Sequence, residues 1–140
     1  MKIQGTMTII LNDKNEVLIA KRHKKKKIAP NRWNFIGGHV EENESIEESA
    51  AREILEEVNL NVSNLIKIDE FHANWDNYKF NCHLFITKII DNSKIKINRE
   101  HSEFIYVDFK DLWKYNIVGF PTSTLNKILL EFFLNEYKFI

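Results

Sequence analysis

A run of glutamates between residues 44 and 57 carries the strongest chemical signal in this sequence. Six of the fourteen residues in this segment are glutamate. If the segment is helical, like charges at neighbouring positions repel one another by roughly a few tenths of a kcal/mol per pair. A bound cation would offset that repulsion, so the segment indicates a metal-binding surface. The six residues are Glu44, Glu47, Glu48, Glu53, Glu56 and Glu57.

Three of these glutamates share one helical face. Glu53, Glu56 and Glu57 stand at i, i+3 and i+4, so their carboxylates project from the same side of a helix. Converging carboxylates favour hard divalent cations, which indicates Mg²⁺, with Mn²⁺ possible. Such a cation takes further ligands from substrate phosphates and makes a bound water more acidic, with a glutamate as general base. The alternative for the same spacing is an acidic helix face that is only solvated.

A pair of glycines, Gly37 and Gly38, precedes the acidic segment. Glycine permits a positive φ and a close approach of the backbone. We therefore expect a carbonyl oxygen of this pair to be free to coordinate the cation. Ser45 followed by Glu48 forms a capping box that predicts the start of the helix, and Asn59 is expected to end it in a left-handed conformation.

The segment from Gly38 to Leu60 resembles the signature of the Nudix hydrolases, G-x5-E-x7-R-E-U-x-E-E-x-G-U, where U is a bulky aliphatic residue. Eight positions match at the required spacing, and Asn59 replaces the last glycine. Ile36 stands where the family commonly has proline before the glycine pair. Both departures affect backbone shape, so we expect the metal face to be intact. The matching residues are Gly38, Glu44, Arg52, Glu53, Ile54, Glu56, Glu57 and Leu60.

The resemblance implies a fold, a reaction and a set of residue roles. It implies an α/β/α sandwich around a central mixed sheet, formed as one domain over residues 1–140. It implies Mg²⁺-dependent hydrolysis of a nucleoside diphosphate linked to another group. Glu53, Glu56 and Glu57 would be metal ligands, with a carbonyl of Gly37 or Gly38. Glu44 and Arg52 would orient the site, and a glutamate from a later loop would complete it, Glu103 in preference to Glu100.

The substrate is less closely constrained. The small size of the chain and its start near the first strand resemble the sanitising nucleoside triphosphatases, which favours a (d)NTP hydrolysed to the nucleoside monophosphate and pyrophosphate. Tyr78 lies 18 residues beyond Leu60. This spacing is seen in dinucleoside-polyphosphate hydrolases, so a dinucleoside polyphosphate is an alternative substrate. A further alternative is an RNA 5′ end, held by the basic loop Lys24–Lys27. A different class of function is a non-catalytic nucleotide-sensing module.

Substrate contacts are expected from several parts of the chain. Arg22 and His23, at a strand end, are placed to bind phosphate, and arginine can grip it with two parallel hydrogen bonds. The alternative for Lys24–Lys27 is a solvated loop. An aromatic side chain with amide or hydroxyl groups suits a stacked, hydrogen-bonded base. These groups are expected from Asn34, Phe35, Trp75, Thr122 and Ser123.

Apolar periodicity predicts the elements that carry these residues. Residues 7–10 and 16–22 are expected to form a β-hairpin, and 31–36 a short strand leading to the glycine pair. The helix over 46–58 is expected to bury Ile54 and Leu55. Further strands are expected over 65–71, 78–90 and 104–109, with polar loops at 72–77 and 99–103, a helical turn at 110–114 and a closing helix over 124–137.

Composition excludes several classes of protein. The 140 residues suit one domain, and 44% hydrophobic content can form a sizeable core. Lys+Arg and Asp+Glu are both 20, and this balance argues against a general nucleic-acid-binding or membrane-surface protein, so no DNA partner is expected. The single cysteine, Cys82, excludes an internal disulfide and is expected in the core. Without a signal-peptide or transmembrane run, the protein is expected to be cytoplasmic, as a monomer or homodimer.

Overall fold

The computed structural model describes residues 2–75, 77–89 and 95–118. The closing helix expected over 124–137 therefore lies outside the described residues, and so do Thr122 and Ser123. The described elements, in chain order, are β1 (Ile3–Leu11), β2 (Glu16–Arg22), β3 (Trp33–Asn34), β4 (Ile36–His39), α1 (Ile46–Val58), β5 (Ile66–Trp75), β6 (Tyr78–Lys88), β7 (His101–Asp108) and the 3₁₀ helix η1 (Phe109–Tyr115).

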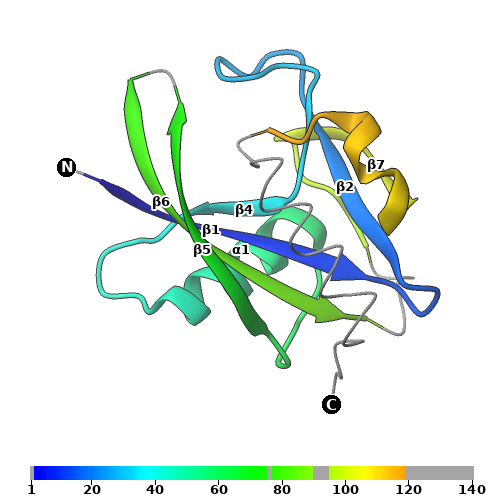
Figure 1. The fold of residues 1–140 in the computed structure, drawn as a ribbon, viewed down its shortest axis with the longest axis horizontal. Helices are drawn as coiled ribbons and strands as arrows, with labels where there is room; N and C mark the ends of the chain where they lie inside the picture. Colours follow the sequence, from blue (N-terminus) through cyan, green and yellow to red (C-terminus); the bar gives the residue numbers. More distant parts are fainter. Residues whose placement is uncertain (1, 76, 90–94, 119–140) are drawn as a thin grey trace.

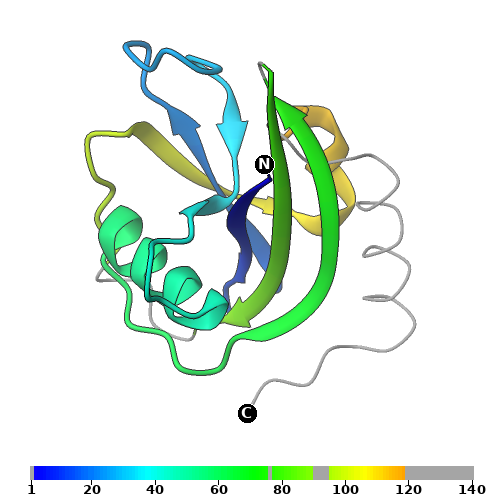
Figure 2. The same ribbon diagram turned by 90° about the vertical axis from the view of Figure 1, so that its left-hand side faces the viewer.

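The described strands form one mixed sheet of seven strands. Their order is β3-β2-β1-β6-β5, and in addition β4 pairs with β1 and β7 with β2. β1 runs parallel to β6 over its whole length and antiparallel to β4 and β2. The sheet is strongly twisted, and α1 lies against one of its faces (Figure 1). Figure 2 shows η1 on the other side of the sheet.

The central strand β1 contributes to the apolar core on both faces of the sheet. Successive side chains of a strand point to opposite faces. Ile9 packs with Leu84 of β6 and Phe109 of η1 on one face. Ile10 packs with Ile54 of α1 on the other. The run of apolar residues at the end of β1 is thus explained by its burial on both sides.

The ends of α1 agree with the capping residues expected from the sequence. Ser45 Oγ accepts a hydrogen bond from Glu48 N at 3.1 Å. Asn59 is left-handed, with φ of 61°, and its N–H donates to the carbonyl of Leu55. The expectation that Leu55 is buried beside Ile54 is wrong, because its side chain is 44% exposed while Ile54 is fully buried. Neighbouring residues diverge by about 100° around a helix, so both cannot face the same sheet.

Three segments differ from their expected conformations. The expected strand over 31–36 is two strands, β3 and β4, and the glycine pair lies within β4 because β4 pairs with β1. The expected loop at 72–77 is mostly strand, since β5 pairs with β6 out to Trp75 and the chain turns near Asn77, whose φ is 71°. The charged segment at 99–103 is not all loop, because His101 already pairs with Arg22 of β2.

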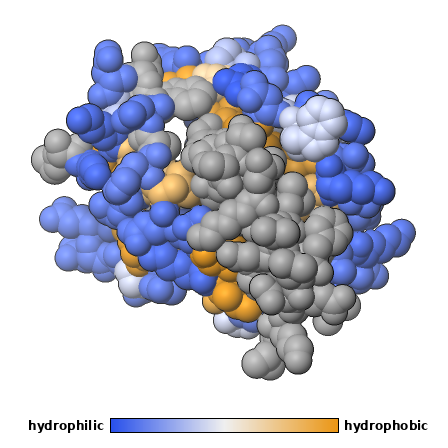
Figure 3. Space-filling model, in the orientation of Figure 1, coloured by the Kyte–Doolittle hydropathy of each residue, from blue (hydrophilic) through white to orange (hydrophobic). Residues whose placement is uncertain are grey.

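Two surface properties follow from this arrangement. Hydrophilic residues cover most of the described surface visible in Figure 3, with smaller apolar areas between them. None of the helices in the described part of the chain has the length and apolar character needed to cross a membrane.

The Cys82 thiol is buried, as expected, and burial raises its pKa to about 11.

Candidate active site

The glycine pair brings β4 into close contact with both β1 and α1. A Cβ atom on Gly37 would overlap the backbone oxygen of Thr6 in β1, and a Cβ on Gly38 would lie 2.5 Å from Oε1 of Glu53. Neither glycine has a left-handed backbone. Glycine is therefore needed at 37 because two backbones meet there, whereas at 38 a Cβ would displace the end of the Glu53 side chain. Neither position uses the positive φ that the sequence also allowed.

Glu57 is the most enclosed carboxylate of α1. Its side chain is 2% exposed, and Oε2 accepts a hydrogen bond from Gly37 N at 3.1 Å. Burial raises the pKa of Glu57 well above its ordinary value, and the charges of Glu53 and Glu100 raise it further. The ionised form of such a carboxylate is unfavourable unless a positive charge lies close by.

Glu53 shares this environment. Burial raises its pKa, while Arg52 acts in the opposite direction through an ion pair of 3.0 Å between Nη1 and Oε1. The Glu53 side chain is also one of the hydrogen-bonding groups that raise the pKa of Glu57. Two partly or fully buried carboxylates therefore meet beside the glycine pair with an excess of negative charge.

Arg52 connects the surrounding elements. Its Nε and Nη2 donate to the two carboxylate oxygens of Glu44 at 2.7 and 3.0 Å, and Nη2 also donates to the carbonyl of His39 at 3.0 Å. Hydrogen bonding to Arg52 lowers the pKa of Glu44 to about 2. Nη1 donates to Glu56 at 3.1 Å. Arg52 thus ties α1 to β4 and to the loop between them.

The carboxylates of α1 are only partly arranged to bind a hard cation in this structure. Among the residues that the structure describes, no three His, Cys, Asp or Glu side chains already form a group that could hold a metal ion. Glu56 is 55% exposed and is directed to Arg52. Glu53 and Glu57, with a backbone carbonyl of the glycine pair, offer oxygen ligands of the kind that Mg²⁺ prefers. The unfavourable negative charge on these two carboxylates, one buried and one partly buried, is the observation that fits a cation here.

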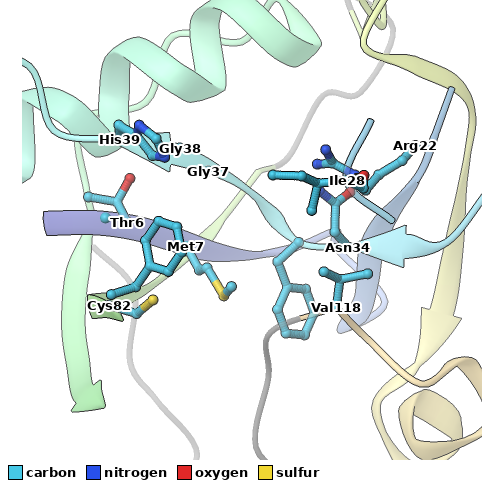
Figure 4. A pocket seen from close by; sticks show the side chains of 13 residues that line it. Thr6, Met7, Arg22, Ile28, Asn34, Gly37, Gly38, His39, Cys82 and Val118 are labelled. Carbon is cyan, nitrogen blue, oxygen red and sulfur yellow. Dashed lines mark hydrogen bonds between the residues drawn. The ribbon is translucent and has the colours of Figure 1, made fainter. Parts of the chain in front are cut away.

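A cavity of about 200 Å³ opens beside this cluster. In Figure 4, Arg22, Ile28 and Asn34 lie together at one end, while Thr6 and His39 lie at the other, near Gly38. The walls are mainly apolar, with a few polar groups directed inward, which is typical of small-molecule sites. The lining residues are Gly5, Thr6, Met7, Arg22, Ile28, Asn34, Phe35, Gly37, Gly38, His39, Phe80, Cys82 and Val118.

The structure separates the two residues that were expected to bind phosphate. Arg22 lines the cavity, and its Nε donates to the carbonyl of Ile28 at 2.9 Å, which orients the guanidinium. Burial lowers the pKa of Arg22, and the negative charges of Glu100 and Glu57 oppose that shift. His23 is not among the lining residues, and its Nδ1 accepts from Lys25 N within its own loop.

Two of the residues expected to read a base also line the cavity. Asn34 and Phe35 are both at its wall, and Phe35 is 2% exposed because it also belongs to the core. Trp75 is the last residue of β5, and its side chain lies outside what the structure describes. Thr122 and Ser123 lie outside the described residues.

Of the two later glutamates, Glu100 has the stronger electrostatic effect on the carboxylates of α1. The charge of Glu100 raises the pKa of both Glu53 and Glu57, whereas Glu103 is not among the largest causes of either shift. Glu103 is exposed on β7, where it pairs with Lys21 of β2. Glu100 also forms an ion pair of 3.7 Å with Lys26.

His101 is a site residue that the sequence reasoning missed. It is 4% exposed, with Nε2 at 3.2 Å from Oδ1 of Asn34 and 3.7 Å from Oε1 of Glu57. Burial lowers the pKa of His101 to about 4, so the imidazole is neutral at neutral pH. The charged residues around it indicate a solvated loop, and no signal in the sequence distinguishes a buried histidine there.

Comparison with known proteins gives consistent matches. The family model described as NUDIX domain matches residues 1–125. An oxidized purine nucleoside triphosphate hydrolase of Danio rerio is 29% identical over 115 residues, covering 79% of this chain and 74% of that protein. A protein of the same name from Mus musculus is 31% identical over 103 residues, covering 70% and 66%.

Solved structures agree. A MutT structure from work on Aliivibrio salmonicida and Vibrio cholerae matches with a TM-score of 0.73 and 26% identity, over 94% of this chain and 100% of that one. The family match covers most of the chain and includes α1, the glycine pair and the cavity. The chain therefore belongs to the NUDIX domain family and is a hydrolase of the Nudix pyrophosphohydrolase type.

Proposed function

We propose that the protein hydrolyses nucleoside triphosphates in the presence of Mg²⁺, or of Mn²⁺ in its place. Water adds to phosphorus, one P–O–P linkage breaks, and a nucleoside monophosphate and pyrophosphate are released. The observation that carries this proposal is the pair of neighbouring carboxylates, Glu57 buried and Glu53 partly buried, beside a cavity that the Arg22 guanidinium also lines. The names of the two vertebrate relatives support an oxidized purine nucleoside triphosphate as the substrate.

Each group of the site has a place in this reaction. Glu53, Glu57 and a carbonyl of Gly37 or Gly38 would hold the cation, with Glu56 joining when it leaves Arg52. A divalent cation bound there neutralises phosphate charge and makes a coordinated water more acidic. The α1 glutamates are also the candidates for general base.

The other side of the cavity would hold the rest of the nucleotide. Arg22 carries positive charge at the cavity wall, and its Nε bond to Ile28 fixes it before substrate arrives. Phe35 and Phe80 offer apolar ring surface, while Asn34 offers an amide. These groups suit a base that is stacked on one face and hydrogen-bonded at one edge.

One observation favours an RNA 5′ end as the second candidate. The basic loop Lys24–Lys27 follows Arg22 directly, and Lys26 reaches Glu100 beside the carboxylates. An RNA strand leaving the cavity on this side would pass the positively charged lysines of this loop. Hydrolysis of RNA ends would then fall steeply as salt is raised, whereas hydrolysis of free nucleotides would not.

The deciding experiment is a panel of nucleotides and triphosphorylated RNA, assayed with Mg²⁺ and with EDTA. We expect pyrophosphate and the nucleoside monophosphate in equal amounts from at least one triphosphate, and no release in EDTA. Release of single phosphate would contradict the proposed bond cleavage. If no substrate turns over with either cation, and Glu56→Gln leaves nucleotide affinity and its Mg²⁺ dependence unchanged, the proposal fails.

The two later glutamates give a paired prediction. We expect Glu100→Gln to lower kcat about 10-fold to 100-fold, the usual effect of losing a group that supports a metal site. We expect Glu103→Gln to leave kcat nearly unchanged, because Glu103 is exposed on β7. The measurement is steady-state kinetics at saturating Mg²⁺. A larger loss in the Glu103 variant would restore the preference drawn from the sequence.

A further inference from the structure

We propose that His101 is a positioning residue that fixes the side chain of Asn34, so that the cavity presents amide N–H donors to a nucleobase edge carrying a carbonyl oxygen. This inference rests on the proposed function, since it concerns how the same cavity selects its nucleotide. It starts from two distances: Nε2 of His101 lies 3.2 Å from Oδ1 of Asn34 and 3.7 Å from Oε1 of Glu57.

The surroundings of the imidazole determine which nitrogen carries its proton. A neutral imidazole has one N–H donor and one acceptor nitrogen. Nε2 faces two oxygen atoms, whereas Nδ1 is buried and has no hydrogen-bond partner among the described residues. An N–H at Nδ1 would be a buried donor without an acceptor, which is costly, so the proton belongs on Nε2.

The proton on Nε2 in turn orients the Asn34 amide. Nε2–H needs an acceptor, and only the Oδ1 side of Asn34 can accept. The reversed amide would place Nδ2 against another N–H donor. Asn34 also lines the cavity, so the Nδ2 hydrogens are the part of this amide that is left for a ligand. A base edge that carries an acceptor can form a hydrogen bond with these Nδ2 hydrogens. An edge that carries an amino group would instead place its own hydrogens against them.

The same histidine joins two parts of the site that come from distant elements. Asn34 ends β3, and Glu57 lies in the last turn of α1. His101, at the start of β7, lies between them and is itself 4% exposed. The side chain that would read the base and a carboxylate that would hold the cation are therefore positioned against one buried ring.

The test compares two replacements of His101. His101→Leu introduces an apolar side chain of similar bulk and removes the Nε2–H donor. His101→Gln instead places an amide N–H₂ near the position of Nε2. The probes are ITP and ATP, which differ in carrying a carbonyl or an amino group at C6 of the purine. We expect the wild-type protein to prefer ITP in kcat/KM, and the preference to fall about tenfold in His101→Leu, the discrimination of about one hydrogen bond. His101→Gln retains most of it.

A matched control separates selectivity from folding. His83 is also buried, at 6% exposed, and its Nε2 lies 2.8 Å from Oε1 of Gln4, yet it does not line the cavity. His83→Leu removes a comparable hydrogen bond elsewhere. We expect it to lower thermal stability without changing the ratio of ITP to ATP. An unchanged ratio in a folded His101→Leu, or an equal loss in His83→Leu, would overturn the inference.

A spectroscopic measurement needs neither metal nor turnover. Long-range ¹H–¹⁵N spectra of the wild-type protein in EDTA report which imidazole nitrogen carries the proton. We expect His101 to carry it on Nε2, and the Asn34 side-chain amide signal to shift in His101→Leu but not in His83→Leu. A proton on Nδ1 would contradict the inference. If no nucleotide is hydrolysed the proposed function fails, while this result still decides the orientation of Asn34.

Discussion

Replacing Glu57 by glutamine is expected to lower kcat about 10³-fold, since a catalytic cation supplies several kcal/mol of transition-state stabilisation. Glutamine has nearly the same shape, and its amide oxygen can still accept the hydrogen bond from Gly37 N that Glu57 Oε2 accepts at 3.1 Å. The fold is therefore retained while the negative charge is lost. The predicted defect lies in kcat, so raising the substrate concentration does not restore the rate.

The same variant is expected to change how stability depends on pH. The pKa of Glu57 is raised above 4.5, mainly by burial, so the folded protein holds a proton that the unfolded chain loses as pH rises from that value. The stabilisation is complete below about pH 4.5 and is lost as pH rises through the folded pKa. In EDTA, the wild type should therefore become less stable from acidic to neutral pH, and Glu57→Gln should show a weaker decline.

Denaturant unfolding in EDTA and in Mg²⁺ measures this effect, and steady-state kinetics measures the loss of kcat. Binding of Mg²⁺ should stabilise the wild type and stabilise Glu57→Gln much less. Glu47→Gln is the matched control, because Glu47 lies in the first turn of the same helix and is exposed. If Glu57→Gln keeps wild-type kcat and the same response to Mg²⁺, Glu57 does not hold the cation.

Substitution of the glycines should separate folding from catalysis. We expect Gly37→Ala to destabilise the protein by about 3 kcal/mol, at the upper end of the usual cost of overpacking. Its Cβ would overlap the backbone oxygen of Thr6, and backbone in the paired strands β1 and β4 cannot move aside without loss of pairing. Gly38→Ala instead meets the end of the Glu53 side chain, which can turn away. It should lose activity and keep most of its stability.

Gly5→Ala provides the control within the same strand pair. Its Cβ would lie 3.5 Å from the oxygen of Gly38, an ordinary contact distance. Thermal unfolding and steady-state kinetics of the three variants test this. We expect Gly37→Ala to lose stability, Gly38→Ala to lose activity, and Gly5→Ala to change little in stability. Equal stability of the Gly37 and Gly5 variants would show that β4 is not packed against β1 in this way.

The sequence was most informative where spacing alone determines geometry. The caps of α1 and the burial of Ile54 depend on local backbone preferences and helical period, and the structure confirms them. The difference between Glu56 and Glu57 does not follow from spacing. Glu57 is covered because β4 crosses its side of α1, while Glu56 is exposed and pairs with Arg52. The path of β4 depends on its pairing with β1, about 30 residues away in the chain.

Long-range contacts also explain the residues that were missed. His101 reaches Asn34 across 67 residues of sequence, and its burial follows from the pairing of β7 with β2. The polar residues before Tyr78 were expected to be a loop, yet they form the end of β5. Their partners in β6 satisfy the backbone regardless of side-chain type.

The parallel pairing of β1 with β6 also bears on how the chain folds. Ile3 lies beside Phe80, and the pairing continues to Leu11 beside Lys88, so the central contact of the sheet closes a loop of more than seventy residues. Closing a long loop costs entropy before any contact repays it, and folds rich in such contacts form slowly. A nascent chain that ends at Leu60 already contains the whole glutamate signature but lacks the strand that supports β1. We therefore expect the acidic cluster to assemble late in folding.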